Sequence, residues 1–245
     1  MKSVLVANRG EIAVRILKTL KSMGIRSVQV YSDADRDSLA VRMADQAVNI
    51  GPPPALKSYL NLENILEAAR SAKVEAIHPG YGFLSENPEF AAAVEEEGLI
   101  FLGPASETIR MLGDKVQARK VAVAAGVSVV PGTEDEISNV KEAISCAAEI
   151  GFPVMIKAAA GGGGRGIRVV ENIQALDKIF AISSSEAKAA FGNGALYLEK
   201  FIEHARHIEV QFMGDGRNYV HCFERECSIQ RRRQKIWEEA PAVGI

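Results

Sequence analysis

The feature that most constrains this chain is a glycine-rich run between two short apolar segments, within VMIKAAAGGGGRGIRVV at residues 154–170. The first apolar segment ends at Lys157, and the second spans residues 167–170. Such segments predict two strands joined by a flexible loop, a hairpin whose tip can fold over a ligand. Glycines let backbone N–H groups approach phosphate oxygens closely, and Lys157 adds a positive charge at the base of the loop.

Two interpretations of the glycine run remain open, a phosphate-binding loop and a linker. The run is not a Walker loop, because no GK[ST] follows it. Flexible linkers are usually polar on both sides, whereas this run has apolar segments before and after it. The flanking segments therefore favour phosphate binding.

The chain as a whole has the composition of a globular protein with one or two domains, since 47% of its 245 residues are hydrophobic and 24% are charged. Its net charge of -2 gives no general reason to bind nucleic acid or an anionic membrane. No apolar run is long enough to cross a bilayer, and no signal peptide follows Met1. Cys146, Cys222 and Cys227 form no CxxC pair, so we expect reduced thiols, no zinc site and a cytoplasmic protein.

The N-terminal part alternates between strand and helix patterns. Residues 3–7 and 27–31 are strand-like, and Ile12, Ile16 and Leu20 form one line of a helix between them. This order predicts a parallel sheet with a right-handed crossover. Gly10 stands alone where a GxGxxG fingerprint would lie, so we expect a Rossmann-like module without a requirement for a dinucleotide.

A second segment of interest, HPGYGFLSEN at residues 78–87, follows a predicted helix at 62–72 and a strand at 74–77. Ligands bind at the carboxyl ends of strands in open α/β sheets, and this segment can present Tyr81 and backbone amides there. A purely structural turn is the alternative, which the spacing alone favours. A helix at 88–97 and an apolar segment at 99–102 complete the module.

The second half combines the glycine run with polar side chains on predicted strands. Helices are expected at 106–125, up to about 150 and at 172–191, a strand at 196–202 and an antiparallel hairpin through 206–224. The polar residues of interest are Lys157, His207, Gln230, Gln234 and Lys235. They suit a nucleoside triphosphate and a small anion, because phosphoryl transfer depends on positive charge and positioned donors. A nucleic-acid patch over residues 231–235 is not favoured, since aromatic residues are not interleaved there.

With these residues in place, the chain resembles the biotin carboxylase family of ATP-grasp enzymes. The motifs are ANRGEIA, KSYLN, HPGYGFLSEN, GDKVQAR, the glycine run, LEKFIE, RHIEVQ, ERECSIQRRRQK and EEAP, and together they extend over essentially the whole chain. The resemblance implies an α/β protein: a Rossmann-like N-terminal parallel sheet, an ATP-grasp lid and the start of the larger ATP-grasp lobe. The implied boundaries are 1–103, a helical linker at 104–130, the lid at 131–202 and the lobe from 203 to 245.

The resemblance also implies a reaction and its participants. Biotin carboxylases are ligases that use ATP and bicarbonate to carboxylate N1′ of biotin through carboxyphosphate, with magnesium or manganese. Biotin is presented on a carrier domain or carrier protein, a carboxyltransferase completes the assembly, and the carboxylase forms a homodimer. Nucleic acid and membranes are not expected partners. The acyl or other acceptor of the carboxyl group is not implied.

The resemblance assigns roles to individual residues of this sequence. ATP contacts fall on Lys115, Lys157, Gly162, Gly163, Gly164, Glu199, Lys200, Ile202, His207 and Gln230. Bicarbonate would face Gln234 and Lys235, and the biotin ureido ring would touch Tyr81 and Gly82. Arg233 stands beside the implied biotin site, where the family usually has histidine.

The family keeps its metal-binding glutamates, a catalytic carboxylate and an oxyanion-binding arginine in a region that would lie beyond Ile245. We therefore expect no metal ligands in this chain and expect it to be part of a longer protein. Two other interpretations remain: a different ATP-grasp ligase, and a catalytically silent nucleotide-binding module. HPGYGFLSEN and QRRRQK argue against the first, because a general ATP-grasp enzyme needs only the lid and its lysines.

Overall fold

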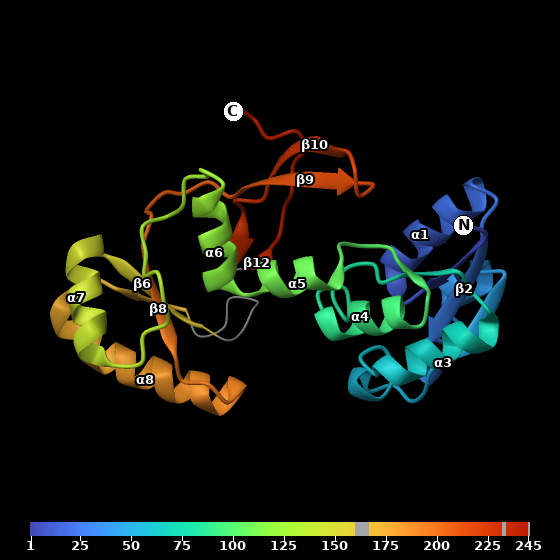
Figure 1. Ribbon diagram of the computed structural model, residues 1–245, viewed down its shortest axis with the longest axis horizontal. Coiled ribbons are helices and arrows are strands. Elements are labelled where there is room, and N and C mark those ends of the chain that lie inside the picture. Colours follow the sequence, from blue (N-terminus) through green and yellow to red (C-terminus); the bar gives the residue numbers. More distant parts are fainter. Residues whose placement is uncertain (160–166, 232–233, 245) are drawn as a thin grey trace. The chain divides into compact units, whose positions relative to one another are not determined.

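A computed structural model describes residues 1–159, 167–231 and 234–244 of the chain (Figure 1). Within helices α6 and α8, the side chains of residues 115, 190 and 191 are outside this description. The chain divides into two compact units, Met1–Ala118 and Arg119–Ile245. Each unit has its own hydrophobic core, so each is described separately.

The first unit is built on a five-stranded sheet in which every pairing is parallel. The strand order is β3-β2-β1-β4-β5, with bounds β1 Ser3–Val6, β2 Arg26–Tyr31, β3 Gln46–Asn49, β4 Ala76–His78 and β5 Ile100–Phe101. This arrangement confirms the predicted Rossmann-like parallel sheet. The short edge strand β3 and helix α2 (Leu39–Met43) were not predicted from the sequence.

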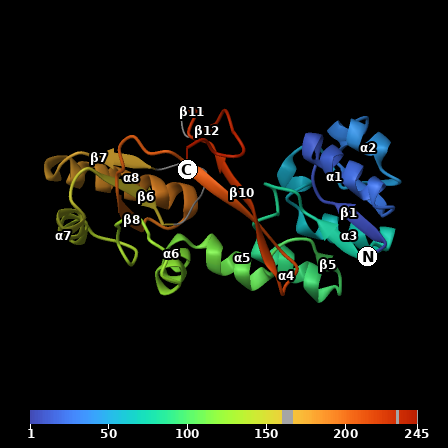
Figure 2. The ribbon, with the colours of Figure 1, turned by 90° about the horizontal axis from the view of Figure 1, so that it is seen from above.

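Helices cover both faces of this sheet. Because successive side chains of a strand point to opposite faces, Val4 and Val6 of β1 pack with α1 (Gly10–Ser22), whereas Leu5 packs with α3 (Leu62–Ala72) and α4 (Pro88–Glu96). Figure 1 shows α1 and α3 on opposite sides of the strands, and Figure 2 shows α1 beside α2. The three central strands, β1, β2 and β4, are consequently buried on both faces, as is usual in parallel sheets.

The helix between β1 and β2 shows how the sequence pattern becomes packing. Its buried residues are Ala13, Ile16, Leu17 and Leu20, spaced at three and four residues on one side of α1. Ile16 and Leu20 of the predicted line are thus confirmed as buried, and Ile12 is partly buried against the same core. Helices α5 (Ser106–Gly113) and α6 (Lys115–Ala124) follow, and the division between the units falls within α6.

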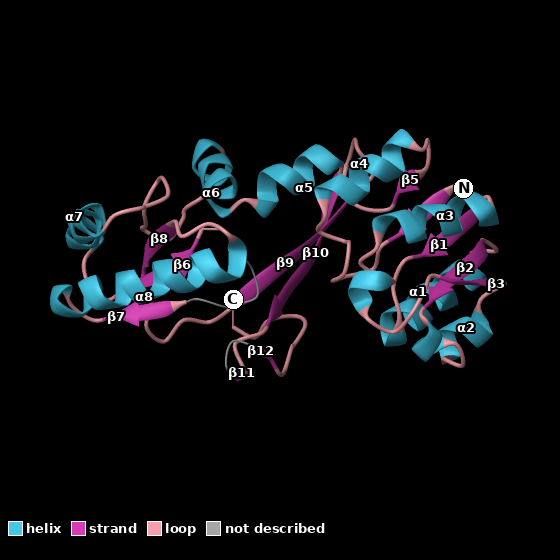
Figure 3. Cartoon of the chain, turned by 90° about the horizontal axis from the view of Figure 1, so that it is seen from below, coloured by secondary structure: helices cyan, strands magenta, loops and turns pink. Residues whose placement is uncertain are grey.

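The second unit, which begins within α6, contains a three-stranded antiparallel sheet in the order β7-β6-β8. Its elements are α7 Val140–Ile150, β6 Val154–Ala158, β7 Arg168–Val170, α8 Ile173–Phe191 and β8 Leu196–Lys200. The pairing of β6 with β7 confirms the hairpin predicted around the glycine run. Helices α7 and α8 pack against each other and against the strands, and Figure 3 shows the strands beside α8. Their shared core includes Ile156, Leu176 and Leu198, all fully buried.

The rest of the second unit consists of antiparallel strand pairs. Strands β9 (Ile208–Gly214) and β10 (Tyr219–Glu226) form the predicted hairpin, with an irregularity between His221 and Glu224. Two short strands, β11 (Gln230–Arg231) and β12 (Gln234–Lys235), pair with each other. No helix in the described parts of the chain is long and apolar enough to cross a membrane.

Candidate functional site

Lys157 lies on the side of the three-stranded sheet that faces away from the core formed with α7 and α8. Along β6 the side chains alternate, so that Ile156 and Ala158 enter the core and Lys157 does not. The Lys157 ammonium forms an ion pair with Glu199 of β8 and lies 5.6 Å from the centre of the Tyr197 ring. Only 19% of the Lys157 side chain and 16% of the Glu199 side chain are exposed. This sheet therefore holds a shielded cation–carboxylate pair at the root of the glycine run.

Lys200, at the end of β8, is engaged mainly in holding the fold. Its ammonium donates to the carbonyl oxygens of Gly151 and Phe152 at 2.9 and 2.8 Å. Its backbone N–H donates to the Pro131 carbonyl at 2.7 Å. The next predicted contact, Ile202, lies just beyond β8 with 49% of its surface exposed. Ile202 is therefore exposed to a ligand, whereas the ammonium and the backbone N–H of Lys200 are already bonded within the fold.

A second polar cluster centres on Glu209, a residue that the sequence analysis did not single out. Its carboxylate accepts hydrogen bonds from Lys235 of β12 and from Arg225 of β10, the latter at 2.5 Å. His207 Nε2 lies 3.3 Å from Glu209 Oε1. The hydrogen bond from Lys235, followed by that from Arg225, lowers the pKa of Glu209 to about 2, and Glu209 in turn raises the pKa of Lys235. The carboxylate therefore holds two permanent cations beside an imidazole.

Two residues that were predicted to contact ATP, His207 and Gln230, also contact each other within this cluster. Gln230 Nε2 lies 3.0 Å from His207 Nδ1 and donates to the Cys227 carbonyl at 3.0 Å. With the amide assigned this way, Nδ1 accepts, and the neutral imidazole carries its proton on Nε2, towards Glu209. Cys227 is fully buried beside them, and burial raises the pKa of its thiol.

The other residues predicted around Lys235 are placed only in part. Gln234 precedes Lys235 in β12 and is exposed, and Lys235 is the one whose side chain enters the cluster. Arg233 and the glycines Gly162, Gly163 and Gly164 lie outside the described residues. Lys115 is the first residue of α6, and its side chain is likewise outside the description.

The predicted biotin-contacting segment lies in the first unit, after β4. Buried Asn8 holds it, since Asn8 Nδ2 donates to the carbonyl oxygens of Pro79 and Tyr81 at 2.7 and 2.8 Å. The Tyr81 hydroxyl donates to Glu11 Oε1 at 2.5 Å, which raises the pKa of Tyr81. Gly82 has a φ of +66°, a left-handed conformation that favours glycine. A pocket of about 380 Å³ is lined by Asn8, Arg9, Gly10, Glu11, Ile12, Tyr81, Gly82 and Phe83.

A buried network supports Arg9, which lines this pocket. The Tyr59 hydroxyl donates to Asp35 Oδ2 at 2.8 Å and accepts from the Ser32 backbone N–H at 3.0 Å. Asp35 also accepts from Arg9 Nη2 at 2.8 Å. Because Tyr59 is almost completely buried, burial is the main reason why its pKa rises to about 12. The network fixes the orientation of the guanidinium.

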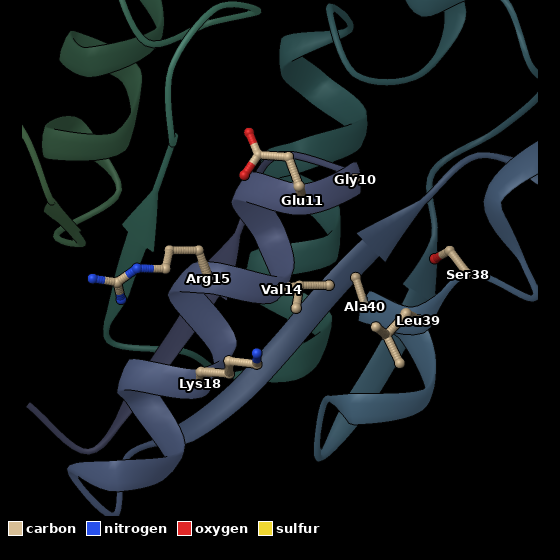
Figure 4. Close-up of a pocket in the computed structure, with 8 residues that line it drawn as sticks. All are labelled: Gly10, Glu11, Val14, Arg15, Lys18, Ser38, Leu39 and Ala40. Carbon is tan, nitrogen blue, oxygen red and sulfur yellow. The ribbon is translucent and has the colours of Figure 1, made fainter. Parts of the chain in front are cut away.

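A neighbouring pocket of about 440 Å³ lies between α1 and α2, and it contains none of the predicted site residues. Figure 4 shows Val14 of α1 beside Leu39 and Ala40 of α2, with Arg15 pointing away from them. Glu11 lines this pocket as well as the one beside Tyr81.

These features together define a class of protein. The chain has a Rossmann-like unit, then a β-hairpin carrying a shielded lysine and strands carrying a histidine–carboxylate–lysine cluster. This order agrees with the ATP-grasp protein expected from the resemblance of the sequence. Residues 114–245 match the family model described as the ATP-binding domain of the carbamoyl-phosphate synthase L chain. Residues 1–109 match the model of the biotin carboxylase N-terminal domain. The chain belongs to the biotin carboxylase family.

Similar proteins support this membership along the whole chain. The sequence is 53% identical to a biotin carboxylase of Allochromatium vinosum, covering 100% of this chain and 55% of that protein. It is 51% identical to the mitochondrial propionyl-CoA carboxylase alpha chain of Sus scrofa, covering 99% of this chain and 33% of that one. The chain thus spans about half the length, or less, of these relatives.

Solved structures agree with the fold. A biotin carboxylase complex with a β,γ-ATP ligand from Campylobacter jejuni has a TM-score of 0.94 at 49% identity, over 99% of this chain and 55% of that one. The biotin carboxylase domain dimer of Hydrogenobacter thermophilus 2-oxoglutarate carboxylase, solved with MgADP, ADP and bicarbonate, has a TM-score of 0.93 at 48% identity. It covers 99% of this chain and 53% of that one.

Some residues of the candidate site were not predicted from the sequence. Glu209 is two positions from His207, and strand alternation alone could have placed both on one side of β9. Arg225 pairs with Glu209 across the hairpin, which requires the register to be known. Asn8 and Glu11 contact Tyr81 across a separation of about 70 residues, and no local pattern indicates such contacts.

Proposed function

We propose that this chain carries the nucleotide-binding lysines and part of the bicarbonate and biotin sites of a biotin carboxylase, which uses ATP and bicarbonate to carboxylate N1′ of biotin through carboxyphosphate. The observation that carries the proposal is the cluster at Glu209. Lys235, Arg225 and His207 all converge on this one carboxylate. Fixed cations beside an imidazole suit a reaction whose partners are anions.

The nucleotide would bind at the sheet of β6 and β8. Lys157 is paired with Glu199, and a triphosphate offers the ammonium a more highly charged partner. Glu199 and the backbone near Ile202 would then face the adenine side. Gly162 to Gly164 and Lys115 complete this proposed contact set.

The anionic co-substrate would bind near Lys235. Because Glu209 fixes the ammonium without covering it, 36% of the Lys235 side chain is still exposed. Bicarbonate would use this ammonium and the neighbouring Gln234. His207 and Gln230, already joined to each other, would line the nucleotide side of the same cluster.

Biotin would meet the segment containing Tyr81 and Gly82, whose backbone is held by Asn8. Arg233 would lie near the biotin ring. A guanidinium stays charged over the working pH range, unlike the histidine usual in the family.

Magnesium or manganese would accompany ATP, but the two carboxylates of the candidate site, Glu199 and Glu209, do not fit the role of oxygen ligands for these ions. Both metals prefer several oxygen ligands. Glu199 is paired with Lys157, and Glu209 is paired with two cations beside a thiol. We therefore assign the ligands of the magnesium or manganese that accompanies ATP to neither Glu199 nor Glu209.

We also propose the partners, the oligomeric state and the location of the protein. The partners are a biotin carboxyl carrier domain or protein and a carboxyltransferase. The assembly is a homodimer, and the location is cytoplasmic. The Hydrogenobacter thermophilus domain was solved as a dimer with MgADP and bicarbonate, which supports the dimer and the magnesium nucleotide.

The test is an ATPase assay on the protein that contains this chain. We expect that protein to release phosphate from ATP only with bicarbonate and to do so faster with free biotin. A Lys235→Met variant should lose the biotin-stimulated part, whereas Lys178→Met, an exposed lysine of α8, should keep it. Phosphate release that depends on another carboxylate or amine substrate, and not on biotin, would indicate a different ATP-grasp ligase.

A further inference from the structure

We propose that His207, Glu209 and Cys227 form a binding site for Zn²⁺ or a metal ion of similar softness. One ligand atom from each residue lies within 4.8 Å of the other two. The donors are an imidazole nitrogen, a carboxylate oxygen and a thiol sulfur, the three kinds of ligand that Zn²⁺ takes in proteins. The inference concerns metal binding by this chain and does not depend on the proposed function.

The fold brings the three donors together through strand pairing. His207 immediately precedes β9, and Cys227 immediately follows β10. The backbone N–H of Cys227 donates to the His207 carbonyl at 2.9 Å, which places the two residues opposite each other. Glu209 is two residues beyond His207, so its side chain emerges on the same side of the strand. The cysteines gave no zinc signal in the sequence because these donors are not in a CxxC motif.

The observed separations are close to those of a bound site. Zn²⁺ bonds of about 2.0–2.3 Å in a tetrahedral arrangement place neighbouring ligand atoms roughly 3.3–3.8 Å apart. The three ligand atoms now lie within 4.8 Å of one another, so they must come about 1 Å closer to bind an ion. Side-chain rotation can supply this movement. To bind the ion, the Cys227 thiol must release its proton to solvent and act as a thiolate. The thiolate and the imidazole favour Zn²⁺ over Mg²⁺, which prefers oxygen ligands.

An outer group is already in place to orient the imidazole. Gln230 lies 3.0 Å from His207 Nδ1, while Nε2 faces Glu209. For Nε2 to bind a metal, its proton must leave and Nδ1 must carry one instead. Gln230 would then turn its amide so that Oε1 accepts from Nδ1–H, and would give up its present hydrogen bond to the Cys227 carbonyl. An acceptor on the second ring nitrogen commonly supports a metal-bound histidine.

Metal binding would compete with Lys235. Glu209 Oε1 is the oxygen that contacts both Lys235 Nζ and His207 Nε2. An ion bonded to that oxygen would displace the ammonium and repel it. Glu209 Oε2 keeps its bond to Arg225. The proposed metal and the observed position of Lys235 are therefore mutually exclusive.

The experiment uses the purified 245-residue chain, reduced and free of metal, titrated with Co²⁺ and with Zn²⁺. We expect one Co²⁺ per chain with a thiolate-to-metal charge-transfer band, and Zn²⁺ should abolish that band. Cys227→Ser should remove the band. Cys222→Ser, which alters an exposed thiol of β10, is the matched control and should retain it.

Two further variants test the geometry. His207→Ala changes an exposed ring and should lower Zn²⁺ affinity about tenfold or more in competition with a chromophoric chelator, with an unchanged melting curve. If Cys227→Ser lowers the melting temperature, the His207→Ala variant still tests the proposed site. Lys235→Met removes the competing cation and should tighten Zn²⁺ binding. A band that survives Cys227→Ser, unchanged affinity in His207→Ala, or unchanged or weaker affinity in Lys235→Met would overturn the proposal.

Discussion

Lys157 is the residue whose replacement most directly tests nucleotide binding. Its ammonium is shielded and paired with Glu199, so a bound phosphate would meet a preformed cation. We expect Lys157→Met to weaken ATP binding by about tenfold or more, because a charge-assisted hydrogen bond contributes about 1.5–3 kcal/mol. Calorimetric titration with ATP measures this change.

Two comparisons separate phosphate binding from loss of the ion pair. Lys178→Met removes an exposed lysine of α8 and should leave ATP affinity unchanged. Glu199→Gln breaks the same ion pair but keeps the ammonium, so it should retain more ATP affinity than Lys157→Met. Equal ATP affinity in the wild type and Lys157→Met would remove Lys157 from the site.

The Tyr59 hydroxyl should make the stability of the first unit depend on pH. Its hydroxyl bonds to Asp35 and Ser32, and its pKa rises to about 12 in the fold. An unfolded tyrosine titrates near pH 10. Since the unfolded state loses its proton first, the extra stability is present below about pH 10 and is lost as the pH rises towards 12.

Tyr59→Phe should therefore destabilise the first unit by about 1–3 kcal/mol near neutral pH, because it leaves buried polar groups unpaired. The difference from the wild type should shrink above about pH 10. Urea unfolding at a series of pH values measures it. A difference that stays constant up to pH 12 would mean that the hydroxyl does not titrate as described.

At the scale of secondary structure, four helices begin in the same way. Asn61, Asn87, Asn139 and Asn172 each accept a hydrogen bond from the backbone three residues later, at the starts of α3, α4, α7 and α8. Such a cap satisfies an N–H group that the helix itself leaves unpaired. By contrast, α1 begins after Arg9 without a side-chain cap.

Asn172→Ala should lower the stability of the second unit by about 1 kcal/mol, whereas Asn172→Asp should retain most of it. The reason is that α8 packs against both β6 and β7, so fraying at its start is transmitted to the sheet. Chemical unfolding followed by circular dichroism compares the two variants. If Asn172→Asp lost as much stability as Asn172→Ala, the oxygen at this position would not act as a cap.

The elements that the sequence predicted well are those with strong local patterns. The apolar stripe of α1 and the runs on either side of the glycines follow periods of the helix and the strand, and the structure confirms both. Strand β3 was missed because half of its four residues, Gln46 and Asn49, are polar and exposed at the sheet edge. Gly132 approaches β8 so closely that an added Cβ would lie 2.7 Å from the Leu198 carbonyl. That contact depends on tertiary structure, as does the convergence on Glu209.

At the scale of the whole molecule, each hydrophobic cluster draws its residues from one unit. Leu5 and Ile77 belong to the first unit, and Ile156 and Leu198 belong to the second. A chain with separate cores need not unfold in one step. We therefore expect a core substitution in one unit to leave the local stability of the other unchanged.

Leu198→Ala tests this expectation, because Leu198 of β8 is fully buried in the core that the sheet shares with α7 and α8. Deleting such a side chain costs about 2–5 kcal/mol, and 1.4 kcal/mol corresponds to about tenfold in an equilibrium constant. Amides of β6 and β8 should thus exchange at least about 25-fold faster with deuterium, whereas amides of β1 and β2 should not change. Leu5→Ala should give the reverse pattern. If either variant accelerated amide exchange equally in both units, the chain would unfold as a single cooperative body. The two units divided at Ala118 would then not be independently stable.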